Sequence, residues 1–316
     1  MDDAIASAIT QLEERFAPIF RDAGIHCLMR YGEPINHTLW HYTTGENLVR
    51  ILGGDTLWTT QISCLNDENE VLHSMHLLDA SIRARVETSK AEIKALYERI
   101  LGYLKDADSS YEGLFIACFS RKSDDLSQWR AYGGGEGGYA IGFKSNDLYR
   151  PHNPDLFGDL GRILRPVVYD DATKLGILNS ILNALEETFL SYISKSPNSQ
   201  DPIADFCVAL SEQFRPFSAI LKNFAYEAEN EWRIIQYLSD RKQLHFVGRR
   251  NIITRHLPIK FSSTPGRLPI AGVVVGPSQH KRLNVISVRD ILYKAGYDED
   301  VISNVKESIV PYRDFN

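Results

Sequence analysis

The spacing of apolar positions predicts alternating strands and helices along most of the chain. In residues 2–17 apolar side chains recur about every 3.6 positions, which is typical of an amphipathic helix, and Pro18 is expected to end it. Short apolar runs bounded by turn residues indicate strands, which we expect at 39–44, 57–63, 111–120, 139–143, 163–170, 232–261 in several pieces, and 272–276. Longer stretches with few helix breakers indicate helices, which we expect at 46–54, 66 to about 105, 124–132, 171–195, 202–221 and 278–296.

The order of these elements predicts an α+β fold. Strands form two groups, 39–63 with 114–143 and 163–169 with 232–275, and helical segments separate them. We therefore expect one α+β domain over residues 37–316, preceded by an N-terminal helix and connector over 1–36. Helical insertions are expected at about 67–105 and 171–221.

Composition and charge exclude several classes of protein. With 316 residues, 43% apolar and 24% charged, the chain is typical of a globular protein. Its net charge of −6 argues against a protein that coats nucleic acid. Because no apolar run is long enough to cross a membrane and the N-terminus carries acids, we expect a cytoplasmic protein with no membrane partner. The four cysteines lack a C-x-x-C pair, so we expect buried thiols.

Two motifs on paper do not carry chemistry. Gly133-x-Gly135-x-x-Gly138 fits the dinucleotide-binding fingerprint, but that fingerprint needs a strand before it and a helix after it. The expected order here is the reverse, so we interpret the glycines as a tight turn or a mobile loop. His73-x-x-His76 lacks a nearby third ligand, and we therefore expect no metal site.

Three polar segments are unusual for plain structure: 40–44, 65–70 and 226–233. In an extended chain Glu229 and Glu231 would share one face. Two carboxylates at such a short distance repel each other unless a cation or a substrate compensates their charge. Each segment also has a structural interpretation: a core histidine at His41, a helix cap at Asn66, and a solvated strand edge at 226–233. Together they favour one common site.

Six motifs in order resemble a bacterial family catalogued as domain of unknown function 2971. They are L-W-H-Y-T-T with N-D-E-x-E, C-F-S with L-S-Q-W-R-A-Y, G-Y-A-I-G-F, Y-E-x-E-x-E-W-R, V-V-V-G-P and S-I-V-P-Y-R. The resemblance runs from about 37 to 313. The name of this family implies no activity.

A second resemblance, to ADP-ribosyltransferases of the H–Y–E type, does imply an activity. It rests on a strand ending in H-Y-T-T, a helix of the type N-L-x-x-I-L, a second strand L-W-T-T, and a late strand bearing E-x-E. It implies a mostly antiparallel split β-sandwich that clamps NAD as a substrate, with His41 and Glu231 facing one cleft from neighbouring strands. His41 would bind a ribose or the adenosine half, Glu231 would be the catalytic carboxylate, and Glu229 its partner. The other cofactor-binding candidates are Tyr42, Thr43, Thr44 and Asn66, with Trp129, Tyr132 or Tyr139 stacking on nicotinamide.

The second resemblance implies an NAD-dependent ADP-ribosyltransferase that modifies a macromolecule, as bacterial toxins and antiphage defence effectors do, with an antitoxin as a further partner. The alternatives are a non-catalytic nucleotide-sensing or interaction module on the same scaffold, and an NAD glycohydrolase. The acceptor is a nucleic acid such as RNA, or a protein. A basic rim at Arg241, Lys242, Arg249 and Arg250 is either a solvated strand pair or a surface that engages phosphates.

Overall fold

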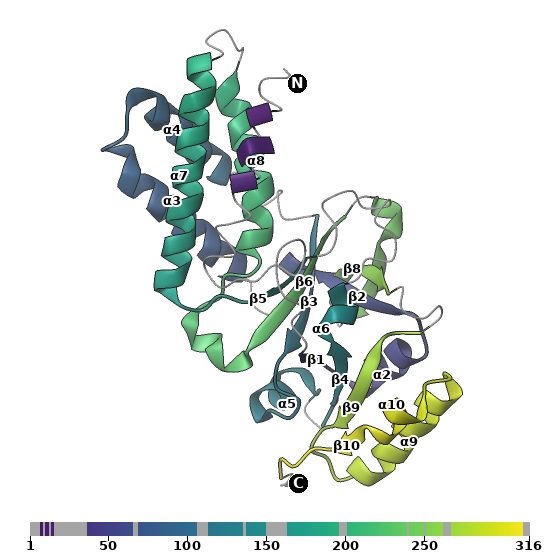
Figure 1. Ribbon diagram of the computed structural model, residues 1–316. Coiled ribbons are helices and arrows are strands. Elements are labelled where there is room, and N and C mark those ends of the chain that lie inside the picture. Colours follow the sequence, from purple (N-terminus) through teal and green to yellow (C-terminus); the bar gives the residue numbers. More distant parts are fainter. Residues whose placement is uncertain are drawn as a thin grey trace. The chain divides into compact units, whose positions relative to one another are not determined.

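The computed structural model divides the chain into two compact units (Figure 1). The first comprises Met1–Cys27, Gln61–Leu114 and Val167–Tyr226, and the second comprises Leu28–Thr60, Phe115–Pro166 and Glu227–Asn316. The residues that the structure describes are 7–8, 10–12, 14–15, 37–65, 69–105, 113–134, 137–149, 163–195, 201–238, 240–249, 251–261 and 267–311.

The first unit is a bundle of helices. Its long helices, which pack against one another, are α3 (Asn69–Val86), α4 (Ala91–Lys105), α7 (Asp171–Lys195) and α8 (Pro202–Ser218) (Figure 1). The short helix η1 (Ile62–Cys64) lies near one sequence boundary of this unit, and η5 (Phe224–Glu229) crosses another. The N-terminal segment and the two helical insertions predicted from the sequence thus supply this unit together.

The sequence predicted one helix up to about residue 105, and that prediction is wrong in one respect. The structure has two helices, because the chain turns between α3 and α4. The hydroxyls of Thr88 and Ser89 both donate to the carbonyl of Arg85, at 3.2 and 2.8 Å. Serine and threonine compete in this way with the helical hydrogen bonds of the backbone, so the two residues end α3.

The second unit is built around a mixed sheet. Its strands are β1 (Thr38–Thr43), β2 (Thr56–Gln61), β3 (Leu114–Ser120), β4 (Tyr139–Lys144), β5 (Ile163–Pro166), β6 (Glu231–Tyr237), β7 (His245–Arg249), β8 (Ile252–Lys260), β9 (Ile270–Val275) and β10 (Val305–Glu307). Their order is β10-β9-β4-β1-β3-β2-β8-β7, while β6 pairs with both β3 and β5. The pairing of β9 with β10 is parallel, and β1–β3, β1–β4, β2–β8, β4–β9, β5–β6 and β7–β8 are antiparallel. The predicted α+β class with a largely antiparallel sheet is therefore confirmed.

Two apolar clusters hold this unit together. The main core lies on one side of the strands and takes side chains from α2 (Gly45–Leu52), α6 (Ser145–Tyr149), α9 (Lys281–Lys294) and α10 (Glu299–Ser303). A smaller cluster contains Tyr42, Ala140, Val274 and Trp129, and Trp129 comes from α5 (Leu126–Tyr132). Tyr42 and Leu39 belong to different clusters because side chains alternate along β1.

The strand expected at 163–170 is shorter in the structure. Strand β5 ends at Pro166, which has no N–H to donate to a ladder. Beyond it Val168 forms an isolated parallel bridge with Leu221.

Candidate functional site

Three motifs that are distant in the sequence meet at the carboxyl end of β3, within the second unit. On one side Trp40 of β1 pairs with Ser120 of β3. On the other side the Ser120 hydroxyl donates to the carbonyl of Glu229 at 2.7 Å, and the N–H of Arg121 donates to the carbonyl of Asn230 at 3.1 Å. The structure thus gathers H-Y-T-T, the loop before S-Q-W-R-A-Y, and E-N-E-W-R around one strand end.

The imidazole of His41 links β1 to β3. Its Nδ1 lies 2.9 Å from the carbonyl oxygen of Cys118, which can only accept, so Nδ1 carries the proton and donates. Burial lowers the pKa of His41 below its ordinary value, against the smaller opposing effect of this hydrogen bond. The ring is therefore neutral near pH 7, and Nε2 is an acceptor. The side chain is half-buried and packs against Phe119 at 5.7 Å between ring centroids.

Tyr42 points away from His41, to the other face of the sheet. Its hydroxyl donates to the carbonyl of Lys122 at 2.8 Å and accepts from the N–H of Asp125 at 3.1 Å, while its ring meets Trp129 edge-on at 4.5 Å. Burial raises the pKa of Tyr42, so the hydroxyl stays protonated and can donate. Tyr42 thus fixes the loop that leads into α5.

The two threonines of the motif, both cofactor-binding candidates, lie in different elements. Thr43 ends β1 and is buried, on the same face as His41. Thr44 lies after the strand and caps α2, where its hydroxyl accepts from the N–H of Asn47 at 3.5 Å. The capping position accounts for Thr44 without a ligand.

The prediction that Glu229 and Glu231 share a strand face is wrong. Glu229 is the last residue of the short helix η5, and Asn230 has a positive φ of 47° before β6 begins at Glu231. The rule that residues two apart share a face applies only to extended backbone, so it begins to apply at Glu231.

The partner of Glu231 on that face is Arg233. Its Nε and Nη2 donate to the two carboxylate oxygens at 2.7 and 3.0 Å. The side chains are 6% and 1% exposed. The negative charge of Glu231 is therefore balanced by a buried guanidinium rather than opposed by a second carboxylate.

His41 and Glu231 occupy strands on either side of β3 but leave opposite faces. His41 pairs with Ile141, a main-core residue, and paired residues project to the same face. On β6 Trp232 belongs to the main core, so Glu231 projects to the other face. This differs from the expectation that the two residues face one cleft from neighbouring strands, because β3 lies between β1 and β6.

The three aromatic candidates differ in what they can offer a ligand. Trp129 is 3% exposed, and its Nε1 donates to Asp124 at 2.7 Å, so its ring is part of the small cluster. Tyr132, also on α5, is half-buried beside that cluster. Tyr139 begins β4 opposite Thr43 and is half-buried, and burial raises its pKa. The two tyrosines are therefore less buried than Trp129.

The described glycines between α5 and β4 approach one another closely, which favours the first of the two interpretations from the sequence, a tight turn. Gly133 follows the last residue of α5, and a Cβ placed on it would lie 1.8 Å from the carbonyl oxygen of Gly137. Gly138 has φ +120°, and its carbonyl accepts from the N–H of Gly276 at 2.8 Å. Helix precedes strand here, so the dinucleotide fingerprint does not apply.

The sequence analysis missed several residues that build this region. Lys122 donates from Nζ to Asp125 at 3.0 Å and to the carbonyl of Ala228 at 2.8 Å, tying the loop to the segment before β6. Asp124 accepts from the hydroxyl of Ser308 at 2.6 Å and the N–H of Ile309 at 2.7 Å. Asp125 before L-S-Q is a recognisable helix cap, and E-x-R was recognisable as a same-face pair, whereas the bonds of Lys122 and Asp124 depend on tertiary contacts.

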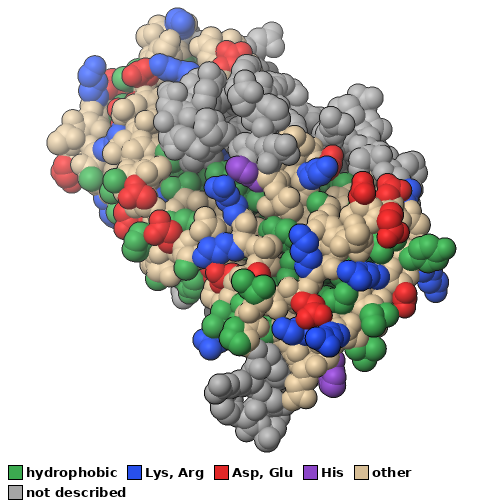
Figure 2. All heavy atoms as spheres, turned by 60° about the horizontal axis from the view of Figure 1, so that its bottom comes forward, with side chains coloured by type: hydrophobic (Ala, Val, Ile, Leu, Met, Phe, Trp, Pro, Cys, Tyr) green, Lys and Arg blue, Asp and Glu red, His purple; other side chains and the backbone are tan. Residues whose placement is uncertain are grey.

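The remaining predicted site residues lie elsewhere or outside the described residues. Asn66 and Arg250 are outside them, and Arg249 ends β7. Arg241 and Lys242 form the exposed short helix η6 (Arg241–Gln243). On the face drawn in Figure 2, Lys and Arg side chains lie among acidic and hydrophobic ones rather than in one continuous patch.

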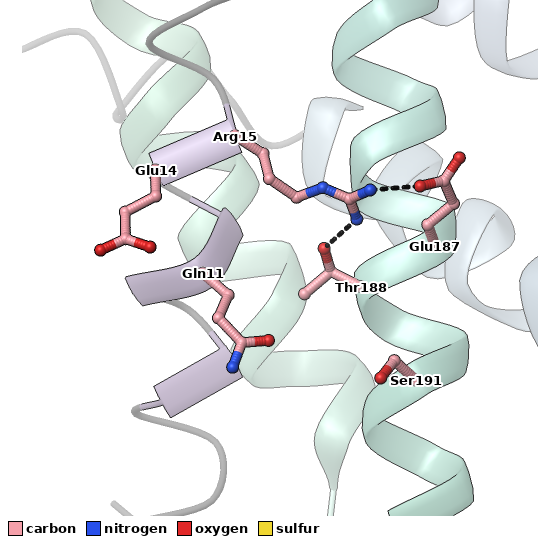
Figure 3. A pocket seen from close by; sticks show the side chains of 6 residues that line it. All are labelled: Gln11, Glu14, Arg15, Glu187, Thr188 and Ser191. Carbon is pink, nitrogen blue, oxygen red and sulfur yellow. Dashed lines mark hydrogen bonds and ion pairs between the residues drawn. The ribbon is translucent and has the colours of Figure 1, made fainter.

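The helical unit has a hollow of its own, lined by Gln11, Glu14, Arg15, Glu187, Thr188 and Ser191, with a volume of about 360 Å³ (Figure 3). Arg15 reaches across it, pairs with Glu187 and donates to the hydroxyl of Thr188 at 3.1 Å. The positive charge of Arg15 is therefore paired with a carboxylate of the same helical unit.

Other classes of site were sought in the part of the chain that the structure describes. No three His, Cys, Asp or Glu side chains there gather as metal ligands, and none of the helices there is long and apolar enough to span a bilayer. Of the cysteines, Cys207 is buried as expected, whereas Cys64 and Cys118 are half-buried and Cys27 lies outside the described residues.

Comparison with protein families supports the first resemblance. Residues 128–234 match the model of DUF2971, a protein family of unknown function. The matched segment begins in α5 and ends in β6, so it includes Trp129, Glu229, Glu231 and Arg233. Searches of curated proteins and of solved structures found no match. The resemblance to ADP-ribosyltransferases stays a prediction.

Proposed function

We propose that the region around the end of β3 binds NAD and that the protein is an NAD-dependent ADP-ribosyltransferase. The observation that supports this most is the meeting of three motifs there, with a neutral His41 whose Nε2 can accept from a ribose hydroxyl. Strand β1 pairs with β4 along its whole length, from Thr38 to Thr43, and it pairs with β3 where Trp40 lies opposite Ser120. NAD has two nucleoside halves, and in this proposal one half lies at His41 while the other passes the end of β3 to lie near Glu231 on the opposite face.

The chemistry asks little of the protein beyond binding and electrostatics. The bond between ribose C1′ and nicotinamide breaks, its electron pair stays on the ring nitrogen, and nicotinamide leaves neutral. An acceptor oxygen or nitrogen bonds to C1′ and loses its proton. In this proposal the Glu231 carboxylate, oriented by Arg233, accepts from the 2′-hydroxyl and stabilises the cationic sugar.

The ion pair also favours a second candidate, a module that binds the nucleotide without turning it over. Arg233 balances the charge that would stabilise the sugar cation, and Glu231 is 6% exposed. A carboxylate held in this way can orient a hydroxyl while contributing less to bond cleavage.

The two candidates differ in nicotinamide release. Purified protein is titrated with NAD by calorimetry, and nicotinamide is then quantified with total RNA, DNA and protein present as acceptors. A transferase releases nicotinamide and labels one acceptor, a glycohydrolase releases it without labelling, and a binding module does neither. Absence of both binding and release would remove the NAD proposal altogether.

Two variants locate the site. In a transferase Glu231→Gln lowers turnover by about two to four orders of magnitude. Because Glu231 is buried, the intrinsic fluorescence of the Glu231→Gln variant must first match that of the wild type, which shows that the variant is folded. The second variant is His41→Ala, which replaces a half-buried residue and should weaken NAD binding. The control Tyr293→Ala replaces an exposed residue and should leave NAD binding unchanged. Equal binding by His41→Ala and the wild type would place the nucleotide elsewhere.

A further inference from the structure

The hairpin of β7 and β8 differs in charge from the rest of the chain. Residues 241–256 contain five Lys or Arg and no acid, in a protein whose net charge is −6. Arg241 and Lys242 are exposed just before β7, and Asp240 is used as the cap of η6, where it accepts from the N–H of Lys242. Strand β7 is the last in the order of the sheet.

The same hairpin exposes apolar side chains that water does not favour. Phe246, Ile252 and Ile253 are 62%, 64% and 69% exposed. Phe246 pairs across the strands with Arg255. Ring surface and positive charge therefore lie next to each other along the edge of the sheet, on a part of the protein that contributes little to its core.

The opposite face of the hairpin repeats this combination. The exposed ring of His245 lies 4.9 Å from Trp58, and the guanidinium of Arg50 lies over the same indole at 5.0 Å. The ring of His256 flanks Trp58 at 5.7 Å. Both faces thus carry aromatic rings with cations beside them.

We propose that the β7–β8 hairpin binds single-stranded nucleic acid, with a base stacked on Phe246 and backbone phosphates near Arg241 and Lys242. Aromatic rings beside cations are what an unpaired strand requires, because every base has a face to stack and every nucleotide carries a charge. A protein partner would leave the excess of cations unexplained. The identification of the bound strand as the acceptor rests on the proposed function, whereas the binding itself does not.

The test measures binding without NAD. Fluorescein-labelled dT12 and rU12, together with a 12-base-pair duplex, are titrated with the full chain, and anisotropy is followed at several salt concentrations. We expect one or both single strands to bind and the duplex to bind more weakly. Phe246→Ala should weaken binding about tenfold, as loss of one stacked base does. The matched control is Tyr293→Ala, because Tyr293 is an aromatic residue of the same unit that is more exposed than Phe246, at 76% on α9.

The charged residues have a separate readout. Arg241→Gln/Lys242→Gln should reduce the slope of log affinity against log salt by about 1.4, which corresponds to two phosphate contacts on a single strand. Arg282→Gln/Lys294→Gln removes the same charge from exposed positions on α9 and should leave the slope unchanged.

Three results would overturn the proposal: no binding of either single strand at low salt, equal effects of the hairpin variants and their controls, or a wild-type dimer that Phe246→Ala converts to a monomer. The last would identify the hairpin as a contact between two copies of the chain. NAD turnover is measured separately on Phe246→Ala without nucleic acid. A loss of NAD turnover in Phe246→Ala would bear on the proposed function and would not test nucleic-acid binding by the hairpin.

Discussion

Removal of the Glu231 carboxylate is expected to destabilise the second unit strongly. Arg233 is 1% exposed and donates two hydrogen bonds to Glu231, so Glu231→Ala removes both hydrogen bonds and a neighbouring negative charge from a buried guanidinium. Breaking a buried ion pair from one side costs about 3–5 kcal/mol in free energy of unfolding. At about 1.4 kcal/mol per factor of ten, the unfolding equilibrium constant should rise by roughly two to three and a half orders of magnitude.

Urea unfolding followed by tryptophan fluorescence measures this unit selectively. All four tryptophans, Trp40, Trp58, Trp129 and Trp232, belong to the second unit. The control is Glu227→Ala, an exposed carboxylate in η5, which should change the free energy of unfolding by no more than about 0.5 kcal/mol.

A double variant distinguishes the loss of a counter-charge from the loss of packing. Glu231→Leu/Arg233→Met removes both charges and keeps apolar volume, and such replacements of buried pairs are often neutral or stabilising. We therefore expect the double variant to be more stable than Glu231→Ala. If Glu231→Ala costs less than about 1 kcal/mol, or the double variant is no more stable than it, Glu231 and Arg233 do not form a buried pair in solution.

Three further predictions concern single residues. Because the pKa of His41 lies below the unfolded value of 6.5, the unfolded chain binds more protons just below that pH, and stability should fall as the pH drops from 6.5 towards the folded pKa. His41→Gln should reduce the loss of unfolding free energy between pH 7.5 and pH 5.5, as measured by urea titration. If the variant and the wild type lose the same amount, the pH dependence comes from other groups. Gly138→Ala should cost at least about 1–3 kcal/mol, since Gly138 has φ +120° and its Cβ would lie 2.5 Å from the Cα of Gly133. Gly176→Ala, in α7 with open space around it, should stabilise by up to about 1 kcal/mol, and equal melting temperatures of the two variants would contradict the argument. Burial raises the pKa of Cys207 to about 12, so at pH 8 the native protein should react with a thiol reagent at Cys64 well before Cys207, as peptide mapping can show.

Local patterns in the sequence were sufficient for most of the secondary structure. The strand with L-W-H-Y-T, the helix of N-L-V-R-I-L ended by Gly53, and the turn at Gly133–Gly138 depend on periodicity, capping and glycine conformation, which act within a few residues. The break between α3 and α4 was missed because two hydroxyls, rather than a proline or glycine, end the first helix.

The candidate site was predicted only in part, since its residues acquire their roles from tertiary contacts. The sequence identified H-Y-T-T and E-N-E-W-R as unusual, and these segments do meet at β3. The partner of Glu231 depended on where extended backbone begins, and the positive φ of Asn230 places that start at Glu231 rather than Glu229.

The faces to which His41 and Glu231 point could not be predicted from the sequence, for a related reason. Alternation fixes the relative direction of neighbours on one strand, but β1 and β6 are separated by about 190 residues and meet only through β3. Which face of each strand becomes the core is decided by how the strands pair, and that is a property of the whole sheet.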